Sequence, residues 1–214
     1  MDTRRGILII ACGALAREIN ALRRANDWAI DLKCLAPELH NRPQRIAPAV
    51  REQLRAHRGR YRAIFVAYAE CGTMGELDRV LAEEGVERLP GAHCYEFFAG
   101  AQTFAELADA EPGTFYLTDF LTRHFERLVI HGLGIDRHPE LAETYFRNYR
   151  KVVYLSQARS GQLIEQARQI ASRLGLAFEH RFTGYGELGA RLAALAIPAI
   201  PAIPATGAPP AWQT

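Results

Sequence analysis

One uninterrupted apolar stretch, residues 6–14, constrains the fold of this chain more than any other part of the sequence. It carries no charged side chain and includes Cys12 and Gly13 at its end, and a segment with helical spacing follows at residues 15–24. Such a run is typical of a strand buried on both faces, as in parallel sheets covered by helices. Ligands of such sheets bind beyond the carboxyl ends of the strands, so Cys12 is predicted to lie at a ligand-binding edge.

The same alternation of apolar and helical segments continues along most of the chain. Further strands are predicted at residues 28–36, 63–69, 86–90, 113–118, 151–155 and 176–181. Helices are predicted at residues 44–57, 74–83, 97–110 (a pair around Gly100), 119–131, 141–150, 160–174 and 185–195. Six or seven strands alternating with helices predict an α/β fold: a doubly wound, mostly parallel sheet with helices on both faces, in a Rossmann-like three-layer sandwich. Residues 1–195 are predicted to form this single domain.

The last segment, residues 196–214, differs in composition from the rest. It repeats Ala-Ile-Pro three times and then adds Pro209 and Pro210. Proline at every third position excludes a helix and favours polyproline II, so a disordered tail is expected. The alternative is a docking segment anchored by Trp212.

The overall composition excludes several classes of partner. A formal net charge of +2 on 214 residues argues against nucleic acid or an anionic membrane as a partner. The longest apolar run is too short to span a membrane, and the run before Cys12 is too short for a secretion signal. We therefore expect a cytoplasmic protein whose four cysteines are free thiols.

Cysteines and histidines follow several of the predicted strands, which suggests a metal site. Cys12, His40 and Cys71 lie after three successive strands, and connections of one hand would bring these strand ends to one edge of the sheet. A later loop adds His93 and Cys94. Thiolates and imidazoles are the usual ligands of zinc. We therefore expect a zinc site made by Cys12, Cys71 and Cys94 with either His40 or His93.

Six further residues are assigned to the neighbourhood of this metal. Polar side chains near the predicted ligands are the candidate catalytic or substrate-binding residues, namely Tyr95, Glu96 and Asp119. Residues in the turns after the strands are the candidate cofactor-binding residues, namely Gly13, Gly72 and Thr73.

Other interpretations of the same residues remain open. Buried free cysteines often act as small apolar fillers, and Cys34, inside a predicted strand, suits that role. Cys12 at a helix N-terminus also suits a nucleophile with His40 or His93 as its base. The same ligands could instead hold an iron–sulfur cluster. The sequence lacks the glycine-rich motifs that usually accompany dinucleotide or NTP binding.

A set of short motifs resembles the DUF1638 family over about residues 6–195. These motifs are Ala11-Cys12-Gly13-Ala14-Leu15, Leu39-His40 with Pro43, Cys71-Gly72-Thr73, Gly91-Ala92-His93-Cys94-Tyr95-Glu96, residues 115–121 and Asn148-Tyr149. Members of the family often accompany corrinoid proteins and their methyltransferases, so the resemblance implies a role in corrinoid-linked one-carbon metabolism. It implies a corrinoid protein or methyltransferase as partner, corrinoid as a further cofactor, and a small-molecule substrate. An enzyme of this kind would be a methyltransferase-type or thiol-dependent transferase; the alternative is a non-catalytic accessory or chaperone module.

Overall fold

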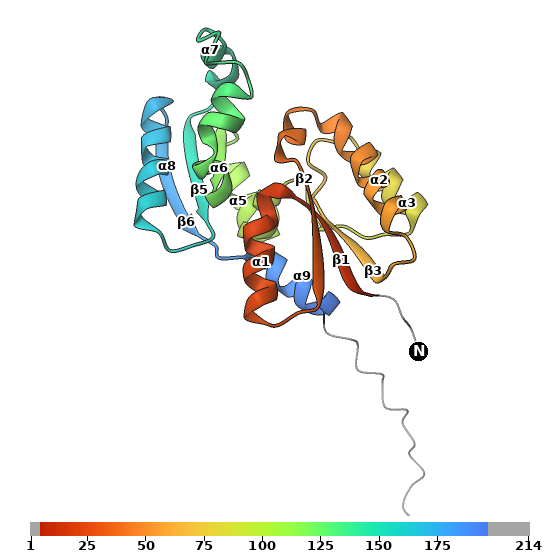
Figure 1. Cartoon of the computed structure of the whole chain (residues 1–214). Coiled ribbons are helices and arrows are strands. Elements are labelled where there is room, and N and C mark those ends of the chain that lie inside the picture. Colours follow the sequence, from red (N-terminus) through yellow and green to blue (C-terminus); the bar gives the residue numbers. More distant parts are fainter. Residues whose placement is uncertain (1–4, 197–214) are drawn as a thin grey trace, which may run out of the picture.

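Two parallel three-stranded sheets form the framework of the protein, as the computed structural model, which describes residues 5–196, shows (Figure 1). The first sheet has the order β2-β1-β3 and the second has the order β4-β5-β6. Every pairing between these strands is parallel. Helices and loops connect each strand to the next, as parallel pairing requires.

The first sheet is built from the amino-terminal part of the chain. Its strands are β1 (Arg5–Cys12), β2 (Ile30–Leu35) and β3 (Tyr61–Ala67), and its helices are α1 (Ala16–Ala25), α2 (Ile46–His57) and α3 (Glu76–Glu84). The central strand β1 is buried from Ile7 to Cys12, since α1 covers one face of the sheet while α2 and α3 cover the other (Figure 1). This burial on both faces explains why the segment is apolar without alternation.

The second sheet is built from the carboxyl-terminal part of the chain. Its strands are β4 (Thr114–Thr118), β5 (Lys151–Ser156) and β6 (Ala177–Phe182). The elements around it are α4 (Cys94–Ala99), α5 (Ala101–Ala110), α6 (Asp119–Arg123), a π-helical turn (Glu126–His131), α7 (Leu141–Phe146) and α8 (Gly161–Arg173). Val152 and Tyr154 of β5 pack into one core cluster with α8, whereas Val153 and Leu155 pack on the opposite face. This strand is therefore also buried on both faces.

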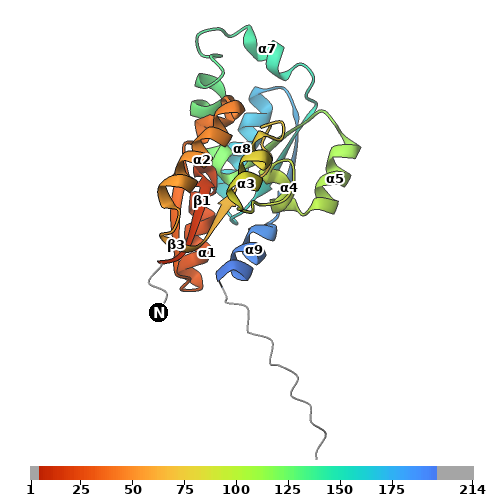
Figure 2. The same cartoon turned by 90° about the vertical axis from the view of Figure 1, so that its right-hand side faces the viewer.

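The last helix, α9 (Gly186–Ala196), returns from the second sheet to the first. Its Leu188 and Leu192 are fully buried in the core of the first sheet, and the helix packs against α4 (Figure 2). The carboxyl-terminal end of the described chain therefore completes the amino-terminal core.

The predicted fold class is confirmed, because the chain is an α/β protein with parallel, Rossmann-like sheets. The strands are divided between two sheets of three, however, and do not form one continuous sheet. The predicted strand at 86–90 is reduced to one isolated bridge between Val66 and Arg88. The bridge consists of two hydrogen bonds, from the Val66 N–H to the Glu87 carbonyl oxygen and from the Leu89 N–H to the Val66 carbonyl oxygen.

The helical predictions are confirmed with small differences. Gly100 separates α4 from α5 as expected, but the predicted helix 119–131 is interrupted at His124, where α6 gives way to the π-helical turn. No helix among residues 5–196 has both the length and the apolar character needed to cross a membrane. The predicted tail with Trp212 lies outside the described residues, so the proposed domain boundary at 195 stays a prediction.

Candidate functional site

Three of the predicted metal ligands follow neighbouring strands of the first sheet. Cys12 is the last residue of β1, His40 lies in the 3₁₀ turn Pro37–Asn41 after β2, and Cys71 follows β3. Because β1 pairs with both β2 and β3, these three residues lie at the same carboxyl edge. Residues nearly sixty positions apart in sequence are thereby brought together at the place where parallel sheets bind ligands.

Cys12 is a buried thiol in contact with His40. Its sulfur accepts a hydrogen bond from the Ala14 N–H at 3.3 Å and lies 3.8 Å from His40 Nδ1. Burial and, to a smaller extent, the neighbouring Cys71 raise the pKa of the Cys12 thiol to about 12, against the lowering effect of the hydrogen bond from Ala14. Cys12 is therefore protonated at neutral pH unless a bound cation or proton acceptor removes its proton.

His40 is oriented by its own turn and by an aromatic neighbour. Its Nδ1 lies 3.2 Å from the Pro37 carbonyl oxygen, and its ring stacks on Tyr68 with 6.1 Å between the ring centroids. Desolvation lowers the pKa of His40 below its ordinary value, so the imidazole is neutral at pH 7. When Nδ1, the nitrogen beside the Cys12 sulfur, donates to the carbonyl, it is Nε2 that keeps a free lone pair for a metal.

Cys71 occupies an unusual backbone conformation in a loop attached to the segment before α4. Its φ angle is +54°, in the left-handed region that non-glycine residues rarely adopt, and its N–H donates to the Ala92 carbonyl at 2.8 Å. Burial raises the pKa of Cys71 to about 11. Strained backbone of this kind is often found at functional sites.

Cys94 joins the same neighbourhood from the first turn of α4. Burial raises the pKa of Cys94 well above its usual range, and Cys71 and Cys12 raise it further. The three thiols are thus close enough to influence one another's ionisation. Among residues 5–196, however, no three His, Cys, Asp or Glu side chains already have the spacing of a formed metal site.

Tyr68, which the sequence analysis did not single out, belongs to this cluster. The side chain is 1% exposed, and its hydroxyl has no hydrogen-bond partner within the described part of the chain. Burial raises the pKa of Tyr68, and the nearby Cys12 and Cys71 raise it further. The available signal was its position near the end of the third predicted strand, residues 63–69, where its hydroxyl interrupts an otherwise apolar run.

The other histidine and one cysteine are exposed side chains outside this cluster, although both are near enough to affect it: His93 lowers the pKa of His40, and Cys34 raises the pKa of Cys12. His93 is exposed at the start of α4, with its ring 6.2 Å from that of Tyr95. Cys34 was expected to be a buried filler, but this is wrong, because β2 is an edge strand and the Cys34 side chain is exposed.

Two of the predicted catalytic carboxylates stabilise loops. Glu96 accepts a hydrogen bond from the Ala92 N–H at 2.9 Å and thereby holds the loop that precedes α4. Asp119 is buried and accepts hydrogen bonds from the Tyr154 hydroxyl at 2.6 Å and from two backbone N–H groups, those of Gln157 and Ala158, at 3.0 Å each. These contacts fasten the end of β4 to the loop after β5.

The predicted cofactor-binding residues also make structural contacts. A side chain at Gly13 would come within 3.0 Å of the Leu35 carbonyl oxygen, so glycine permits the close approach of the turn after β2. Gly72 donates its N–H to Glu70, and the Thr73 hydroxyl donates to the same carboxylate at 2.7 Å. Together these contacts fix the loop that carries Cys71.

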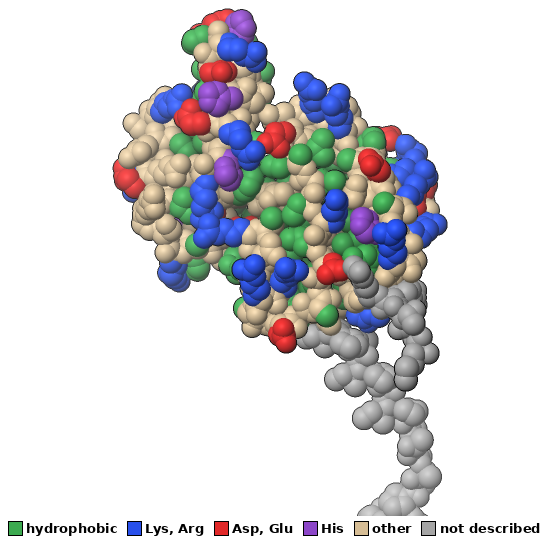
Figure 3. Space-filling view, viewed as in Figure 1, with side chains coloured by type: hydrophobic (Ala, Val, Ile, Leu, Met, Phe, Trp, Pro, Cys, Tyr) green, Lys and Arg blue, Asp and Glu red, His purple; other side chains and the backbone are tan. Residues whose placement is uncertain are grey.

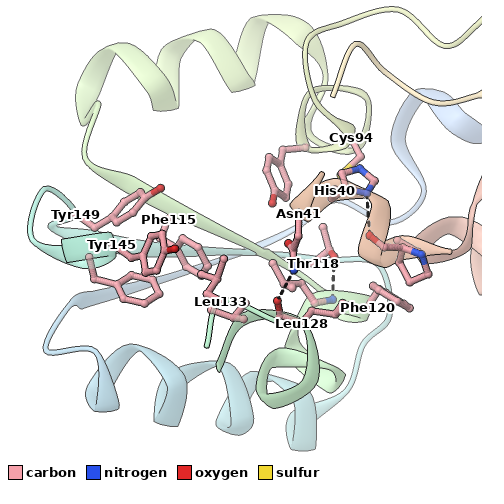
Figure 4. A pocket seen from close by; sticks show the side chains of 16 residues that line it. His40, Asn41, Cys94, Phe115, Thr118, Phe120, Leu128, Leu133, Tyr145 and Tyr149 are labelled. Atoms are coloured by element: carbon pink, nitrogen blue, oxygen red, sulfur yellow. Dashed lines mark hydrogen bonds between the residues drawn. The ribbon is translucent and has the colours of Figure 1, made fainter. Parts of the chain in front are cut away.

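A pocket of about 280 Å³ lies beside the thiol cluster, between the two sheets (Figure 4). Six of its sixteen lining residues are Phe or Tyr, namely Tyr95, Phe115, Phe120, Tyr145, Phe146 and Tyr149, and six more are aliphatic or proline. Its polar lining consists of His40, Asn41, Cys94 and Thr118. Asn41 also links the two parts of the chain by donating to the Leu128 carbonyl oxygen at 3.3 Å. Tyr95, predicted as catalytic, is thus part of the pocket wall and stacks on Tyr116.

Comparison with known proteins identifies a family but no characterised relative. The model of the family described as "Protein of unknown function (DUF1638)" matches residues 34–192, which is most of the chain. His40, Cys71 and Cys94 lie inside the matched segment, and Cys12 precedes it. No curated protein matches the chain.

Proposed function

The chain belongs to the DUF1638 family, and we propose that it binds zinc through Cys12, Cys71, Cys94 and His40. The observation that carries this proposal is the convergence of three thiols and a neutral imidazole at one carboxyl edge of a parallel sheet. Four sulfur and nitrogen donors are the set that zinc prefers, whereas calcium and magnesium prefer oxygen. The pocket beside the donors would then hold a small-molecule substrate.

The chemistry of the donors supports this assignment. The thiols are protonated without metal, and a bound zinc ion stabilises thiolates strongly enough to displace their protons. His40 presents a neutral ring that the Pro37 carbonyl orients, and the unpaired Tyr68 hydroxyl can donate to a thiolate. Because no three donors already have metal-site spacing, binding would draw the Cys71 and Cys94 side chains toward Cys12.

Metal analysis of protein purified without a histidine tag tests the proposal. We expect one zinc ion per chain and tight binding in competition with a chromophoric chelator. Single Cys12→Ser, Cys71→Ser and Cys94→Ser variants should each lose at least about tenfold in zinc affinity, since each removes a ligand.

Cys34→Ser provides the matched control, because Cys34 is a free thiol that is exposed and outside the cluster. It should bind zinc as the unchanged protein does. Equal zinc affinity for the Cys34→Ser variant and for a triple variant at Cys12, Cys71 and Cys94 would contradict the proposal.

Corrinoid-linked methyl transfer is the further part of the proposal and stays a prediction from the family resemblance. A substrate thiol that replaces one of the four protein ligands on zinc would be held as its thiolate, which is a good methyl acceptor. Zinc-loaded protein mixed anaerobically with methylcobalamin and a thiol should then yield the methyl thioether and Co(I). A rate equal to that of zinc-free protein would favour the non-catalytic accessory role.

A further inference from the structure

The pocket beside the thiol cluster has two chemically different ends. Tyr145, Tyr149 and Phe115 lie together at one end, and His40, Asn41 and Cys94 lie at the other (Figure 4). Phe115 makes edge contacts with Phe146 and Tyr149, at 5.5 and 5.4 Å between ring centroids, which fixes the aromatic end. A ligand that fills this pocket must therefore be apolar at one end and polar at the other.

The charge of the lining restricts the ligand further. None of the residues that line the pocket in the described structure is Asp, Glu, Lys or Arg. An ionised group buried here would have no partner of opposite charge, and that state is costly. The lining thus disfavours nucleotides, phosphates and carboxylates.

The volume of the pocket sets the size of the ligand. A cavity of roughly 150 Å³ can hold one benzene ring, so about 280 Å³ suits two fused rings with a small substituent. A whole corrinoid is far larger than this. On the face shown in Figure 3, hydrophobic side chains also gather over the join between the two sheets.

We propose that this pocket binds an uncharged, flat, largely apolar molecule about the size of a fused bicycle. Its rings stack against Tyr145, Tyr149 and Phe115, and its single polar group faces His40, Asn41 and Cys94. This assignment rests on the proposed function only in that the polar group would meet the proposed zinc ion. The pocket itself is formed without metal.

Binding of 2-naphthol and of its charged counterpart 2-naphthoate tests the inference. Calorimetric titration of the zinc-free protein at pH 7 should show saturable binding of 2-naphthol at one site. Binding of 2-naphthoate should be at least about tenfold weaker, because its carboxylate finds no cationic partner. Zinc-free protein separates this result from the metal proposal, since the pocket can bind naphthol whether or not zinc binds.

Two pocket variants and one control locate the site. Tyr145→Ala removes a side chain that is 44% exposed, and Tyr149→Leu keeps the bulk but removes the aromatic ring, so both should fold. Each should weaken 2-naphthol binding about five- to tenfold through lost stacking. Phe182→Ala, which removes an exposed ring outside the pocket, should leave binding unchanged.

Three results would overturn the inference. One is the absence of saturable 2-naphthol binding, and another is equal affinity for 2-naphthoate. The third is an equal loss of affinity in Phe182→Ala and in the two pocket variants.

Discussion

The hydroxyl of Tyr68 is a buried polar group that lies beside the thiols and lacks a hydrogen-bond partner within residues 5–196. It has no hydrogen-bond partner among the described residues, and a buried hydroxyl in this state costs roughly 1–3 kcal/mol. A cost of this size is understandable if the hydroxyl acquires an acceptor when the site is loaded. The Cys12 sulfur becomes a good acceptor once it is a metal-bound thiolate.

Tyr68→Phe tests this role, because it removes only the hydroxyl. We expect zinc affinity to fall about 10- to 100-fold, as it does when an outer hydrogen bond to a ligand is lost. The zinc-free protein should become more stable, by up to about 1–3 kcal/mol, because Phe removes a buried hydroxyl that has no hydrogen-bond partner among residues 5–196. Competition titration measures the zinc affinity, and thermal unfolding measures the stability. Unchanged zinc affinity would show that the hydroxyl does not contribute to zinc binding.

The raised pKa values of the thiols predict how metal binding depends on pH. Without metal, Cys12 and Cys71 have pKa values of about 12 and about 11, so both are protonated between pH 6.5 and 8. Zinc must displace those protons, and its apparent affinity should therefore rise with pH, by up to about tenfold per pH unit for each thiol. His40, whose pKa is lowered by burial, adds less slope than an ordinary histidine would.

Zinc titration at pH 6.5 and 7.5 measures this dependence. An apparent affinity that is independent of pH would mean that the protonated thiols are not the ligands.

Asp119, predicted as a catalytic residue, makes structural contacts that sequence analysis did not reveal. Its place after a predicted strand is also the place of many active-site acids, and the sequence does not reveal where its hydrogen bonds go. The partners Tyr154, Gln157 and Ala158 are 35 to 39 residues away and become neighbours only through the pairing of β4 with β5.

At the scale of elements, Asp119 joins the end of β4 to the loop after β5. Asp119→Asn should destabilise the protein by about 2–3 kcal/mol, since the amide cannot accept all of these hydrogen bonds. Asp109→Asn, at an exposed position on α5, is the control and should change stability by less than about 0.5 kcal/mol. Urea unfolding gives both values. Unchanged stability together with lost activity in Asp119→Asn would support a catalytic role for Asp119.

The strands and helices were largely predictable because their signals are local. Apolar runs identified the three strands of the first sheet, and Gly100 identified the break between α4 and α5. The edge position of β2 was not predictable, because it depends on which strands pair. This explains why Cys34 is exposed although it lies inside a strand.

At the scale of the whole molecule, the division into two sheets could not be predicted either. The sequence of a strand does not show which strand pairs with it. It was therefore not predictable whether β3 pairs with β4 or lies at the edge of its sheet. The convergence of Cys12, His40 and Cys71 was predictable, because it needs only the order of three successive units. The contributions of Tyr68 and of the pocket's aromatic wall depend on packing between distant segments and were missed.

The return of α9 to the first sheet couples the two parts of the molecule. Leu188 and Leu192 are fully buried in the first core, so Leu192→Ala should cost about 2–5 kcal/mol. Leu195→Ala, at a partly buried position on the same helix, should cost less. Equal losses of unfolding free energy for the two substitutions would contradict the described packing. In the unchanged protein, probes placed near each sheet should report one cooperative unfolding transition.

X-ray absorption at the zinc edge of the zinc-loaded protein tests the central claim most directly. A site made by Cys12, Cys71, Cys94 and His40 predicts three sulfur neighbours at about 2.3 Å and one nitrogen at about 2.0–2.1 Å. The Cys34→Ser variant should give the same spectrum. A shell of oxygen and nitrogen atoms alone would show that these thiols do not hold the metal.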